Sequence, residues 1–341
     1  MFFRLVYNKS NEMTEETFMH EVKISKNDAG QRLDKFIAKA LKLPTSLIYK
    51  SIRTKKIKLN RKRTEASVIL AEGDTLQCFL PDEFFEKDNA KIELSHITPS
   101  LNIIYEDENI MLVNKRPGVS VHEDEHEKTN TLITHIQAYL ASKGEYRPEC
   151  EQSFAPALCN RIDRNTGGIV IAAKNAESLR IINEKIKARE IDKFYLAAVH
   201  GIPTPPEATI EGYLIKDEKL NTVRVYGVTD RNIPRAAKKI ITRYKTIAKT
   251  ADTALVEVEL LTGRTHQIRA HMAYIGHPLV GDGKYGVNKE DRARGYKYQA
   301  LCSYKIRFSF STDAGVLSYL KNKEFKIPKN GIYFTKDYFK G

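Results

Sequence analysis

The sequence predicts an α+β protein, with a mixed, largely antiparallel sheet preceded by a small α/β domain. Three observations predict this class. Five strand-like segments follow one another between residues 193 and 261 with no helix between them. One helical stretch, residues 265–274, separates them from a last strand, and the composition changes near residue 101. Runs of consecutive strands form antiparallel sheets, whereas strands that alternate with helices form parallel ones.

The N-terminal elements are predicted from periodicity. Apolar residues at positions 33, 36, 37, 40 and 41 have helical spacing. Pro44 ends this helix, and Thr45 or Ser46 can cap a second one over residues 47–53. Residues 55–63 are expected to form a strand and a basic turn. Two further strands are expected over residues 67–70 and 75–80, separated by a Glu-Gly-Asp turn.

The larger part begins with an expected hairpin, whose strands cover residues 103–105 and 110–113. A turn at 114–118 and a short strand at 119–121 follow, and Thr129 or Asn130 can cap a helix that runs to residue 140. The apolar run 169–173 is expected to be a buried strand, and residues 176–189 the helix after it. The five strands are expected over residues 193–199, 208–216, 222–228, 238–245 and 254–261, and the last strand over 301–310.

These elements divide the chain into four parts. Residues 1–20 form an N-terminal extension, within which Met13 and Met19 are alternative starts. Residues 21–80 form the small α/β domain, and residues 101–341 form the larger domain. The polar segment 81–100 contains Pro81 and Pro99 and is predicted to be a linker.

The composition is that of a globular protein: 41% of the 341 residues are hydrophobic and 29% are charged. No apolar run approaches the roughly 20 residues that cross a bilayer. The first residues turn polar too soon for a signal peptide. The four cysteines are scattered without a C-x-x-C pair, which favours a reducing compartment. We therefore expect the protein in the cytoplasm.

The formal net charge of +13 points to a polyanionic partner, with nucleic acid first and an anionic membrane second. Residues 42–63 hold nine Lys or Arg and no Asp or Glu. A solvated face usually mixes both signs, so this run favours phosphate contacts. The residues expected to contact RNA or DNA are Arg32, Lys50, Arg53, Lys55, Lys56, Lys58, Arg61, Lys62 and Arg63.

Two motif matches lack the context that their chemistry needs. Residues 122–126 read H-E-x-x-H, but they follow a strand and are acidic, whereas a zinc site of this type needs both histidines on a buried helix. Residues 281–286 read G-x-G-x-x-G, but no apolar helix face follows them. His266 and His271 are about 140° apart on a helix, so they do not share a metal-facing side. The sequence thus predicts no metal site and no nucleotide cofactor.

A third motif is stronger. Asp163 stands between Arg161 and Arg164, on a turn that leads into the buried strand 169–173. Side chains on such turns either hydrogen-bond the local backbone or are presented for reaction by a rigid scaffold. Two further segments are candidates to meet it: a strand carrying Tyr195, and a glycine turn carrying Arg264 at a helix start. A guanidinium at that position suits a bidentate pair with a carboxylate.

These three segments resemble the RluA family of pseudouridine synthases. The family pattern H-R-L-D-x-x-T-S-G appears as N-R-I-D-R-N-T-G-G over residues 160–168, and K-x-Y-x-A appears at 193–197. The pattern G-R-T-H-Q-I-R-x-H is complete over residues 263–271, and N-K-R-P-G at 114–118 fits the family opening. Asn160, Ile162 and Gly167 depart from the usual His, Leu and Ser. Residues 22–80 resemble the S4 RNA-binding domain.

The resemblance implies the pseudouridine synthase fold and isomerisation of uridine in structured RNA, without a metal or an organic cofactor. Asp163 would be the catalytic carboxylate, Tyr195 would pack on the uracil and assist loss of the C5 proton, and Arg264 would pair with Asp163. The uridine would leave its stack, and Arg161 would fill its place. The S4-like part favours 23S ribosomal RNA.

Other functions stay open at this point. Transfer RNA is the alternative substrate. A non-catalytic RNA-binding or assembly protein on the same fold is a different class of function, and a hydrolytic glycosylase or metalloenzyme is another. The last would need a second carboxylate or a ligand set that the sequence does not offer. A monomer is the default expectation.

Overall fold

The structure is a computed structural model that describes residues 19–85, 94–124 and 127–339. The chain divides into two compact units. Unit 1 contains the described residues up to His96, with Leu140–Pro156 and Asn175–Glu177, and unit 2 contains the rest. No helix among the described residues is long and apolar enough to cross a membrane.

Unit 1 is built on a four-stranded antiparallel sheet in the order β1-β4-β2-β3. The strands are β1 (Met19–Lys23), β2 (Ile57–Leu59), β3 (Lys62–Arg63) and β4 (Thr75–Phe79), and the helices are α1 (Leu33–Ala40) and α2 (Thr45–Arg53). The helical spacing seen in the sequence buries Phe36 and Ile37 of α1 against Ile48 and Ile52 of α2 in one apolar cluster.

One expected strand of this unit does not form. Residues 67–70 make only an isolated bridge between Ile69 and Arg32, rather than a strand of the sheet. The reason lies in their backbone bonds: Val68 N donates to Glu65 O within a turn, and Leu70 N donates to Gln31 O beside α1. The segment is therefore held by the loop before α1.

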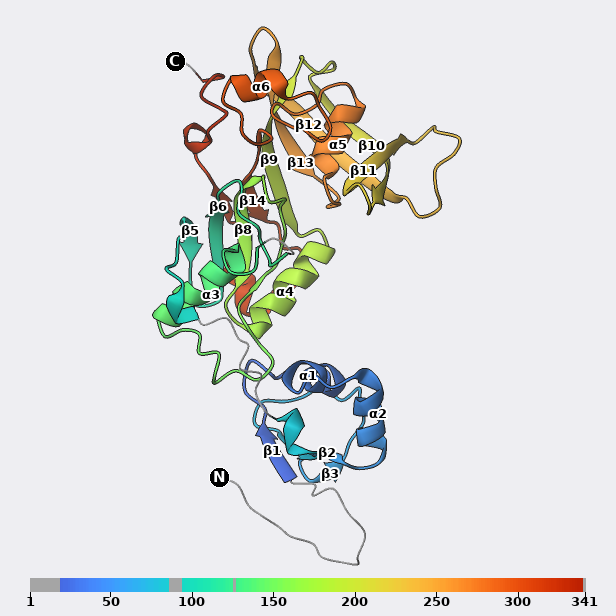
Figure 1. The fold of residues 1–341 in the computed structure, drawn as a ribbon, viewed down its shortest axis with the longest axis vertical. Helices are drawn as coiled ribbons and strands as arrows, with labels where there is room; N and C mark the ends of the chain where they lie inside the picture. The colour runs from blue at the N-terminus through green and yellow to red at the C-terminus, as the bar shows by residue number, and fades with distance from the viewer. Residues whose placement is uncertain (1–18, 86–93, 125–126, 340–341) are drawn as a thin grey trace, which may run out of the picture. The chain divides into compact units, whose positions relative to one another are not determined.

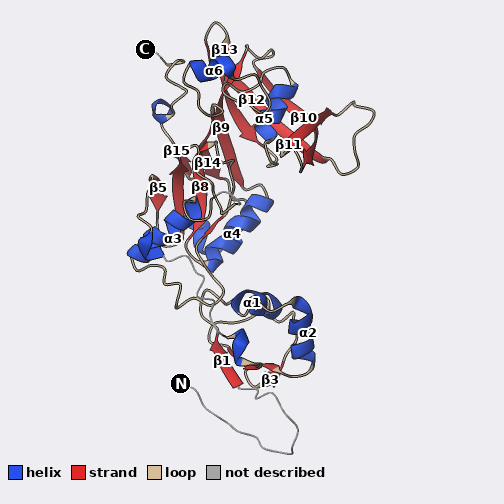
Figure 2. Cartoon of the chain, viewed as in Figure 1, coloured by secondary structure: helices blue, strands red, loops and turns tan. Residues whose placement is uncertain are grey.

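Unit 2 is built on one large sheet in the order β11-β10-β12-β13-β9-β14-β8-β6-β5, to which β7 and β15 add (Figure 1, Figure 2). All pairings are antiparallel except that of β8 with β14. The strands are β5 (Ile103–Glu106), β6 (Ile110–Lys115), β7 (Ala157–Leu158), β8 (Gly167–Ala173), β9 (Ile191–His200), β10 (Glu207–Asp217), β11 (Thr222–Gly227), β12 (Lys238–Lys249), β13 (Thr253–Leu260), β14 (Leu301–Phe308) and β15 (Glu324–Lys326).

The α-helices outside unit 1's small sheet are α3 (Leu132–Ser142), α4 (Ala176–Lys187), α5 (Gln267–Tyr274) and α6 (Lys289–Ala293). Short 3-10 turns cover Asp82–Phe84, Leu94–His96, Gly315–Leu320 and Lys329–Gly331. α5 packs on β11 and β12, where Ala270 joins Leu214, Val223 and Ile240. The short strand expected at 119–121 is only a bridge between Ser120 and Thr131. The predicted α+β class and the largely antiparallel sheet are confirmed.

Alternation along the central strands decides which face carries the site. In β9, Phe194, Leu196 and Ala198 belong to the main core cluster. Successive side chains of a strand point to opposite faces, so Tyr195 lies on the other side of the sheet. Every residue of β8 is buried, as expected for a central strand covered on both faces. The turn that contains Asp163 precedes this strand and is thus anchored to a fully buried strand in the interior of the sheet.

Candidate active site

The Asp163 turn is fixed at its base by its own backbone and by β8. Thr166 N donates to the carbonyl of Asp163 at 3.0 Å, which closes the turn. The hydroxyl of Thr166 accepts a hydrogen bond from the buried side-chain amide of Gln299 at 3.2 Å. The Asp163 side chain itself remains 28% exposed. The result is a carboxylate held on a rigid turn and open to a ligand.

Lys115 fixes the same turn from beneath. Its side chain is fully buried, and Nζ donates to the carbonyl oxygens of Arg116, Val119 and Arg164 at 3.1, 2.8 and 2.8 Å. Three acceptors match the three hydrogens of an ammonium group. Burial lowers the pKa of Lys115 to about 7, against the opposing effect of the Asp163 charge. The lysine thus ties the turn at 116–119 to the residue that follows Asp163.

Tyr195 lies in the middle of β9, between Val258 of β13 and Ser303 of β14. Only 7% of the residue is exposed. Burial raises the pKa of Tyr195 to about 12, and the nearby charge of Asp163 acts in the same direction. The phenol is therefore protonated at neutral pH, and its ring is a flat apolar surface beside Asp163.

The arginine that pairs with Asp163 is Arg269, not Arg264. Arg269 Nη1 lies 3.3 Å from Asp163 Oδ2. Arg264 stands in the turn before α5, where its N–H donates to Gln267 Oε1 at 3.1 Å and its side chain is exposed. Arg269 lies in the following helical turn, buried toward the sheet. The expected pair of Arg264 with Asp163 was therefore wrong in its partner, because the turn geometry directs Arg264 outward.

Asp282 holds the other edge of the same guanidinium. Its carboxylate meets Arg269 Nε at 2.7 Å and Nη2 at 2.8 Å, and it accepts the backbone N–H groups of Lys284 at 2.9 Å and Tyr285 at 3.3 Å. Burial alone would raise the pKa of Asp282, but the hydrogen bonds and charge of Arg269 hold it below its ordinary value. The glycine-rich segment 281–286 is thus a loop that orients Arg269.

His266 and Tyr285 complete the network around Asp163. His266 Nε2 lies 3.8 Å from Asp163 Oδ2, and its Nδ1 lies 2.8 Å from Tyr285 Oη. Tyr285 Oη also accepts the N–H of Val223 in β11 at 2.9 Å. Burial lowers the pKa of His266, so the imidazole is neutral at pH 7. Among the described residues, Oδ2 makes the contacts of the Asp163 carboxylate with Arg269 and His266, and Oδ1 has no hydrogen-bond or ion-pair partner.

Asn160 and Gly167 are the two less conservative departures from the family pattern, and both are accommodated beside the turn. Asn160 Oδ1 accepts the N–H of Ile171 at 2.7 Å, so its side chain continues the β7–β8 pairing where the main chain leaves the sheet. A Cβ at Gly167 would meet Pro117 at 3.2 Å, a tight but bearable distance. A Cβ at Gly168 would lie 2.3 Å from the backbone carbonyl oxygen of Ser303, so any side chain at this position would clash with β14.

The two rejected motifs can now be placed. His122 is exposed on a loop, and His126 lies outside the described residues. Within the described part of the chain, no group of three His, Cys, Asp or Glu side chains is arranged to hold a metal ion. His266 faces Asp163, whereas His271 is buried against Thr242, 2.9 Å from its hydroxyl. The two histidines therefore belong to different surroundings, as their spacing predicts.

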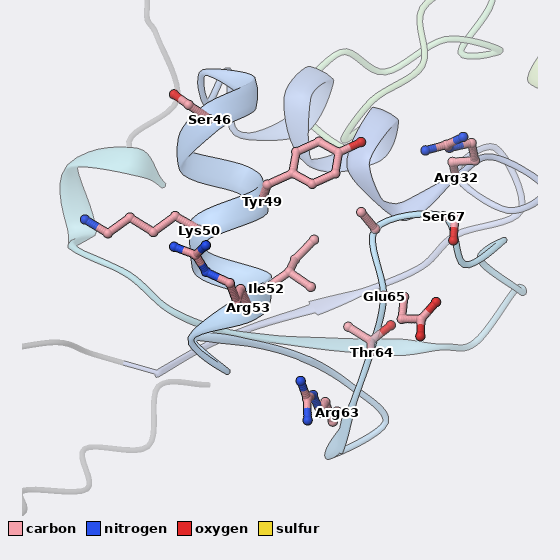
Figure 3. Close-up of a pocket in the computed structure, with 11 residues that line it drawn as sticks. Arg32, Ser46, Tyr49, Lys50, Ile52, Arg53, Arg63, Thr64, Glu65 and Ser67 are labelled. Carbon is pink, nitrogen blue, oxygen red and sulfur yellow. The ribbon is translucent and has the colours of Figure 1, made fainter.

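Unit 1 carries its own basic site. An open pocket of about 960 Å³ is lined by Arg32 just before α1, by residues of α2, and by Arg63 and the segment that follows it (Figure 3). Arg32 is partly neutralised there by Asp34, at 2.8 Å, to which Tyr49 also donates. The other cations on its wall, Lys50, Arg53 and Arg63, are exposed and have no acidic partner among the described residues. The remaining candidates, Lys55, Lys56, Lys58, Arg61 and Lys62, lie on the α2–β2 turn and the β2–β3 hairpin.

The sequence pattern singles out Asp163 and Tyr195 as candidates, but it does not reveal the groups that surround Asp163 in the structure. Arg269 and His266 lie inside the quoted pattern 263–271, yet the pattern does not say which arginine faces inward. No local sequence pattern points to four other residues that support the site, because they lie far from Asp163 in the chain: Lys115, Asp282, Tyr285 and Gln299. Arg161, expected to enter the RNA, is exposed beside Asp163 in the chain.

Comparisons with known proteins identify the family of the chain. Residues 109–274 match the family model described as RNA pseudouridylate synthase. The ribosomal large subunit pseudouridine synthase C of Haemophilus influenzae is 30% identical over 318 residues, which cover 91% of this chain and 94% of the relative. The proteins of the same name from Vibrio vulnificus and Escherichia coli are 33% and 31% identical, and cover 79% and 82% of this chain and 81% and 83% of their own lengths.

Solved structures resemble the chain in fold. Human RNA pseudouridylate synthase domain containing 1 has a TM-score of 0.52 at 21% identity, over 70% of this chain and 85% of its own. Human RNA pseudouridylate synthase domain containing 4 has a TM-score of 0.53 at 21% identity, over 68% and 90%. The sequence relatives extend over most of both chains, which decides the family. The chain belongs to the RluA family of RNA pseudouridine synthases and is an enzyme that isomerises uridine in RNA to pseudouridine.

Proposed function

We propose that this pseudouridine synthase acts on RNA of the large ribosomal subunit in the cytoplasm, with Asp163 as its catalytic carboxylate. The names of the relatives support this substrate. The observation that carries the catalytic assignment is the state of the Asp163 carboxylate. Oδ2 is turned toward Arg269 and His266, and Oδ1 has no partner among the described residues.

This arrangement suits chemistry at an anomeric carbon. Breaking the N1–C1′ bond builds positive charge at C1′, as in glycoside cleavage, and a fixed carboxylate stabilises or captures that charge. Oδ1 is the oxygen presented for this step. The freed uracil then turns, C5 bonds to C1′, the C5 proton leaves and N1 takes up a proton, so no oxidant or group donor is consumed. Arg269 keeps Asp163 oriented throughout.

Tyr195 is the natural platform for the uracil. Its ring is buried in the sheet beside Asp163. Because the raised pKa keeps the phenol protonated at neutral pH, we assign Tyr195 to stacking on the uracil rather than to removal of a proton. Removal of the C5 proton by the phenol oxygen would require a lower pKa in the complex. Arg264 is exposed on the turn before α5, where it is placed to meet the RNA backbone.

The N-terminal basic surface would provide most of the sequence-independent affinity. We assign this to Lys50, Arg53 and Arg63 around the unit 1 pocket and to the cations of the β2–β3 hairpin, consistent with an S4-type RNA-binding domain. Flipping the uridine costs a few kcal/mol of lost stacking, and we expect Arg161 to occupy the vacated space. No metal or organic cofactor is part of the proposal.

Tritium release tests the substrate and the nucleophile together. Transcripts of large-subunit rRNA, small-subunit rRNA and tRNA made with [5-³H]uridine would be incubated with wild type, with Asp163→Asn, and with the surface control Asp313→Asn. Release from large-subunit rRNA by the wild type and the control, but not by Asp163→Asn, is the expected result. Release from tRNA alone would contradict the proposal that large-subunit rRNA is the substrate. Equal release by Asp163→Asn would overturn the assignment of Asp163.

Salt-dependent binding tests the N-terminal assignment. Lys50→Ala, Arg53→Ala and Arg63→Ala combined should weaken RNA binding and flatten its dependence on salt, by about 0.7–0.9 in the log–log slope for each lost phosphate contact. Lys321→Ala, Lys326→Ala and Lys336→Ala combined remove the same charge from exposed positions outside unit 1. Equal losses in the two triple variants would mean that net charge, rather than this surface, is responsible.

A further inference from the structure

His266 has an unusual backbone for its type. Its φ is +54°, in the left-handed region that favours glycine, although it immediately precedes α5. Such conformations cost free energy and persist where the surroundings enforce them, often at functional sites. Here the conformation accompanies an imidazole placed between Asp163 and Tyr285, with its two nitrogens facing different partners.

The hydrogen bonds around Tyr285 favour the tautomer of His266 that carries its hydrogen on Nε2. The N–H of Val223 can only donate, so Tyr285 Oη accepts it at 2.9 Å. The hydroxyl hydrogen of Tyr285 is then available for His266 Nδ1, 2.8 Å away. In a neutral imidazole, an accepting Nδ1 leaves the hydrogen on Nε2. The opposite tautomer would aim a lone pair of Nε2 at the Asp163 carboxylate.

We propose that His266 is a positioning residue that donates its Nε2 hydrogen to Asp163 Oδ2 during the reaction, and that Tyr285 sets the tautomer that makes this possible. The proposal rests on the proposed catalytic role of Asp163. The distance of 3.8 Å is long for a hydrogen bond, and such contacts shorten when substrate closes an active site. Together with Arg269, His266 would reserve Oδ2 and keep Oδ1 turned toward C1′.

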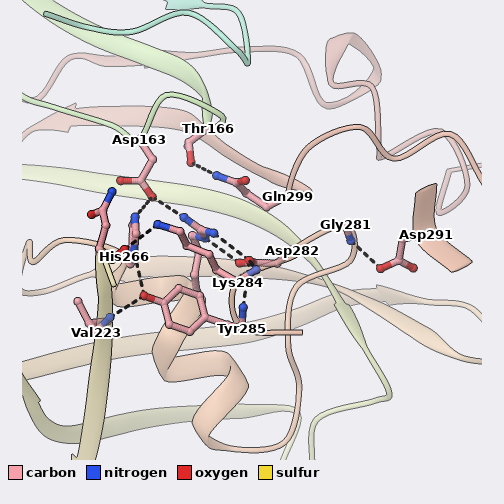
Figure 4. A network of polar contacts seen from close by, with 12 residues as sticks. Asp163, Thr166, Val223, His266, Gly281, Asp282, Lys284, Tyr285, Asp291 and Gln299 are labelled. Carbon is pink, nitrogen blue, oxygen red and sulfur yellow. Dashed lines mark hydrogen bonds and ion pairs between the residues drawn. The ribbon is translucent and has the colours of Figure 1, made fainter. Parts of the chain in front are cut away.

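The same contacts tie this network to the β10–β11 hairpin. Val223 is the second residue of β11, and Lys284, the neighbour of Tyr285, donates from Nζ to the carbonyl of Asn221 at 2.6 Å. Figure 4 shows these side chains converging below Asp163, with Tyr285 between Val223 and His266. The tautomer of His266 therefore depends on how the start of β11 sits against the loop 282–285.

Three substitutions at position 266 distinguish the effect of losing the hydrogen bond to Asp163 from the effect of changing the left-handed backbone conformation. His266→Gln places an amide N–H near the position of Nε2. His266→Asn tolerates the left-handed backbone better than most residues, but its amide is too short to reach Asp163. His266→Ala removes the donor altogether. Single-turnover tritium release should fall about 10-fold to 100-fold in the Asn and Ala variants and be largely restored in the Gln variant, with RNA affinity unchanged in all three.

Nitrogen NMR provides a readout that does not depend on activity. Long-range ¹H–¹⁵N spectra of histidine-labelled protein should show His266 with a protonated Nε2 and a bare Nδ1 in the wild type. Tyr285→Phe removes the donor to Nδ1 and should produce a tautomer mixture. In the kinetic assay Tyr285→Phe should slow the wild type severalfold but add no further loss to His266→Gln, which has no tautomer to set.

The outcomes distinguish failure of this inference from failure of the proposed function. If Asp163→Asn is inactive while His266→Ala and His266→Gln both match the wild type, the positioning role is overturned and the catalytic carboxylate stands. A protonated Nδ1 in the wild-type spectrum would also overturn it. If the Gln and Ala variants lose the same activity, the imidazole acts by shape and not as a donor. Full activity of Asp163→Asn would instead remove the basis of the proposal.

Discussion

Arg269 binds Asp282 in a bidentate ion pair, with Nε 2.7 Å from Oδ2 and Nη2 2.8 Å from Oδ1. The side chain of Asp282 is completely buried and that of Arg269 is 8% exposed. The third guanidinium nitrogen, Nη1, does not contact Asp282 and instead lies 3.3 Å from Asp163 Oδ2. The carboxylate nearer the open surface is thus held by a guanidinium that is itself fixed from behind.

Asp282→Asn should therefore disturb both stability and chemistry. The amide keeps the shape of the side chain but leaves the buried guanidinium without its main counter-charge, and losses of this type are typically about 3 kcal/mol or more. We expect urea unfolding to show a decrease of that order and tritium release to fall with it. The control Asp192→Asn breaks the more exposed pair with Arg307 and should cost less than about 1 kcal/mol. Equal costs would contradict the importance of the buried pair.

Lys115→Met tests the support beneath the Asp163 turn. The substitution removes the Nζ donor from three carbonyl oxygens. The oxygen of Arg164 still accepts the N–H of Gly118 at 2.9 Å, whereas those of Arg116 and Val119 lose this donor, and each unsatisfied buried group costs about 1–3 kcal/mol. The variant should unfold at lower denaturant and, where still folded, show a reduced kcat with little change in KM, because the misplaced turn affects the reacting carboxylate and not the RNA surface. Lys305→Met removes a half-buried lysine 3.7 Å from Glu257 and should leave kcat unchanged. A normal kcat in Lys115→Met would show that the turn holds without it.

Neighbouring glycines give a matched pair of substitutions. Gly168 has a φ of +116°, and an added Cβ would overlap the Ser303 backbone at 2.3–2.7 Å, which would break the β8–β14 contact. Gly167→Ala would meet only Pro117 and the Lys115 carbonyl, at 3.2–3.4 Å. Gly168→Ala should therefore lose several kcal/mol or fail to fold, while Gly167→Ala stays folded and active. Thermal melts and soluble yield measure the difference, and comparable behaviour of the two would contradict the geometry.

The acid sensitivity of the fold should depend partly on His271. Burial lowers the pKa of His271 to about 4, against 6.5 in an unfolded chain. Between these values the unfolded state binds the extra proton, so stability is fully present above pH 6.5 and is lost as the pH falls toward 4, by up to about 1.4 kcal/mol per pH unit. His271→Gln cannot titrate. The difference in unfolding free energy between wild type and variant should shrink from pH 7.5 to 4.5, and a constant difference would exclude this role.

The sequence by itself determined the class of fold, the order of the elements and the segments that form the site. Strand and helix periodicity depend on neighbours a few residues away, so they can be recognised without the fold, and the run 160–168 identified Asp163 because its pattern is local. The strand expected at 67–70 failed since its backbone bonds go to the loop before α1, a partner that periodicity cannot reveal.

Only the tertiary structure decided which groups surround Asp163. Lys115, Arg269 and Asp282 come from three separate places in the chain, and β6, α5 and the loop after α5 bring them together around the Asp163 turn. Arg264 and Arg269 carry the same charge in the same motif, and their roles differ because a turn directs one side chain outward and a helix directs the other inward. Proximity is the physical quantity that pairs a carboxylate with its arginine, and proximity between distant segments is set by packing.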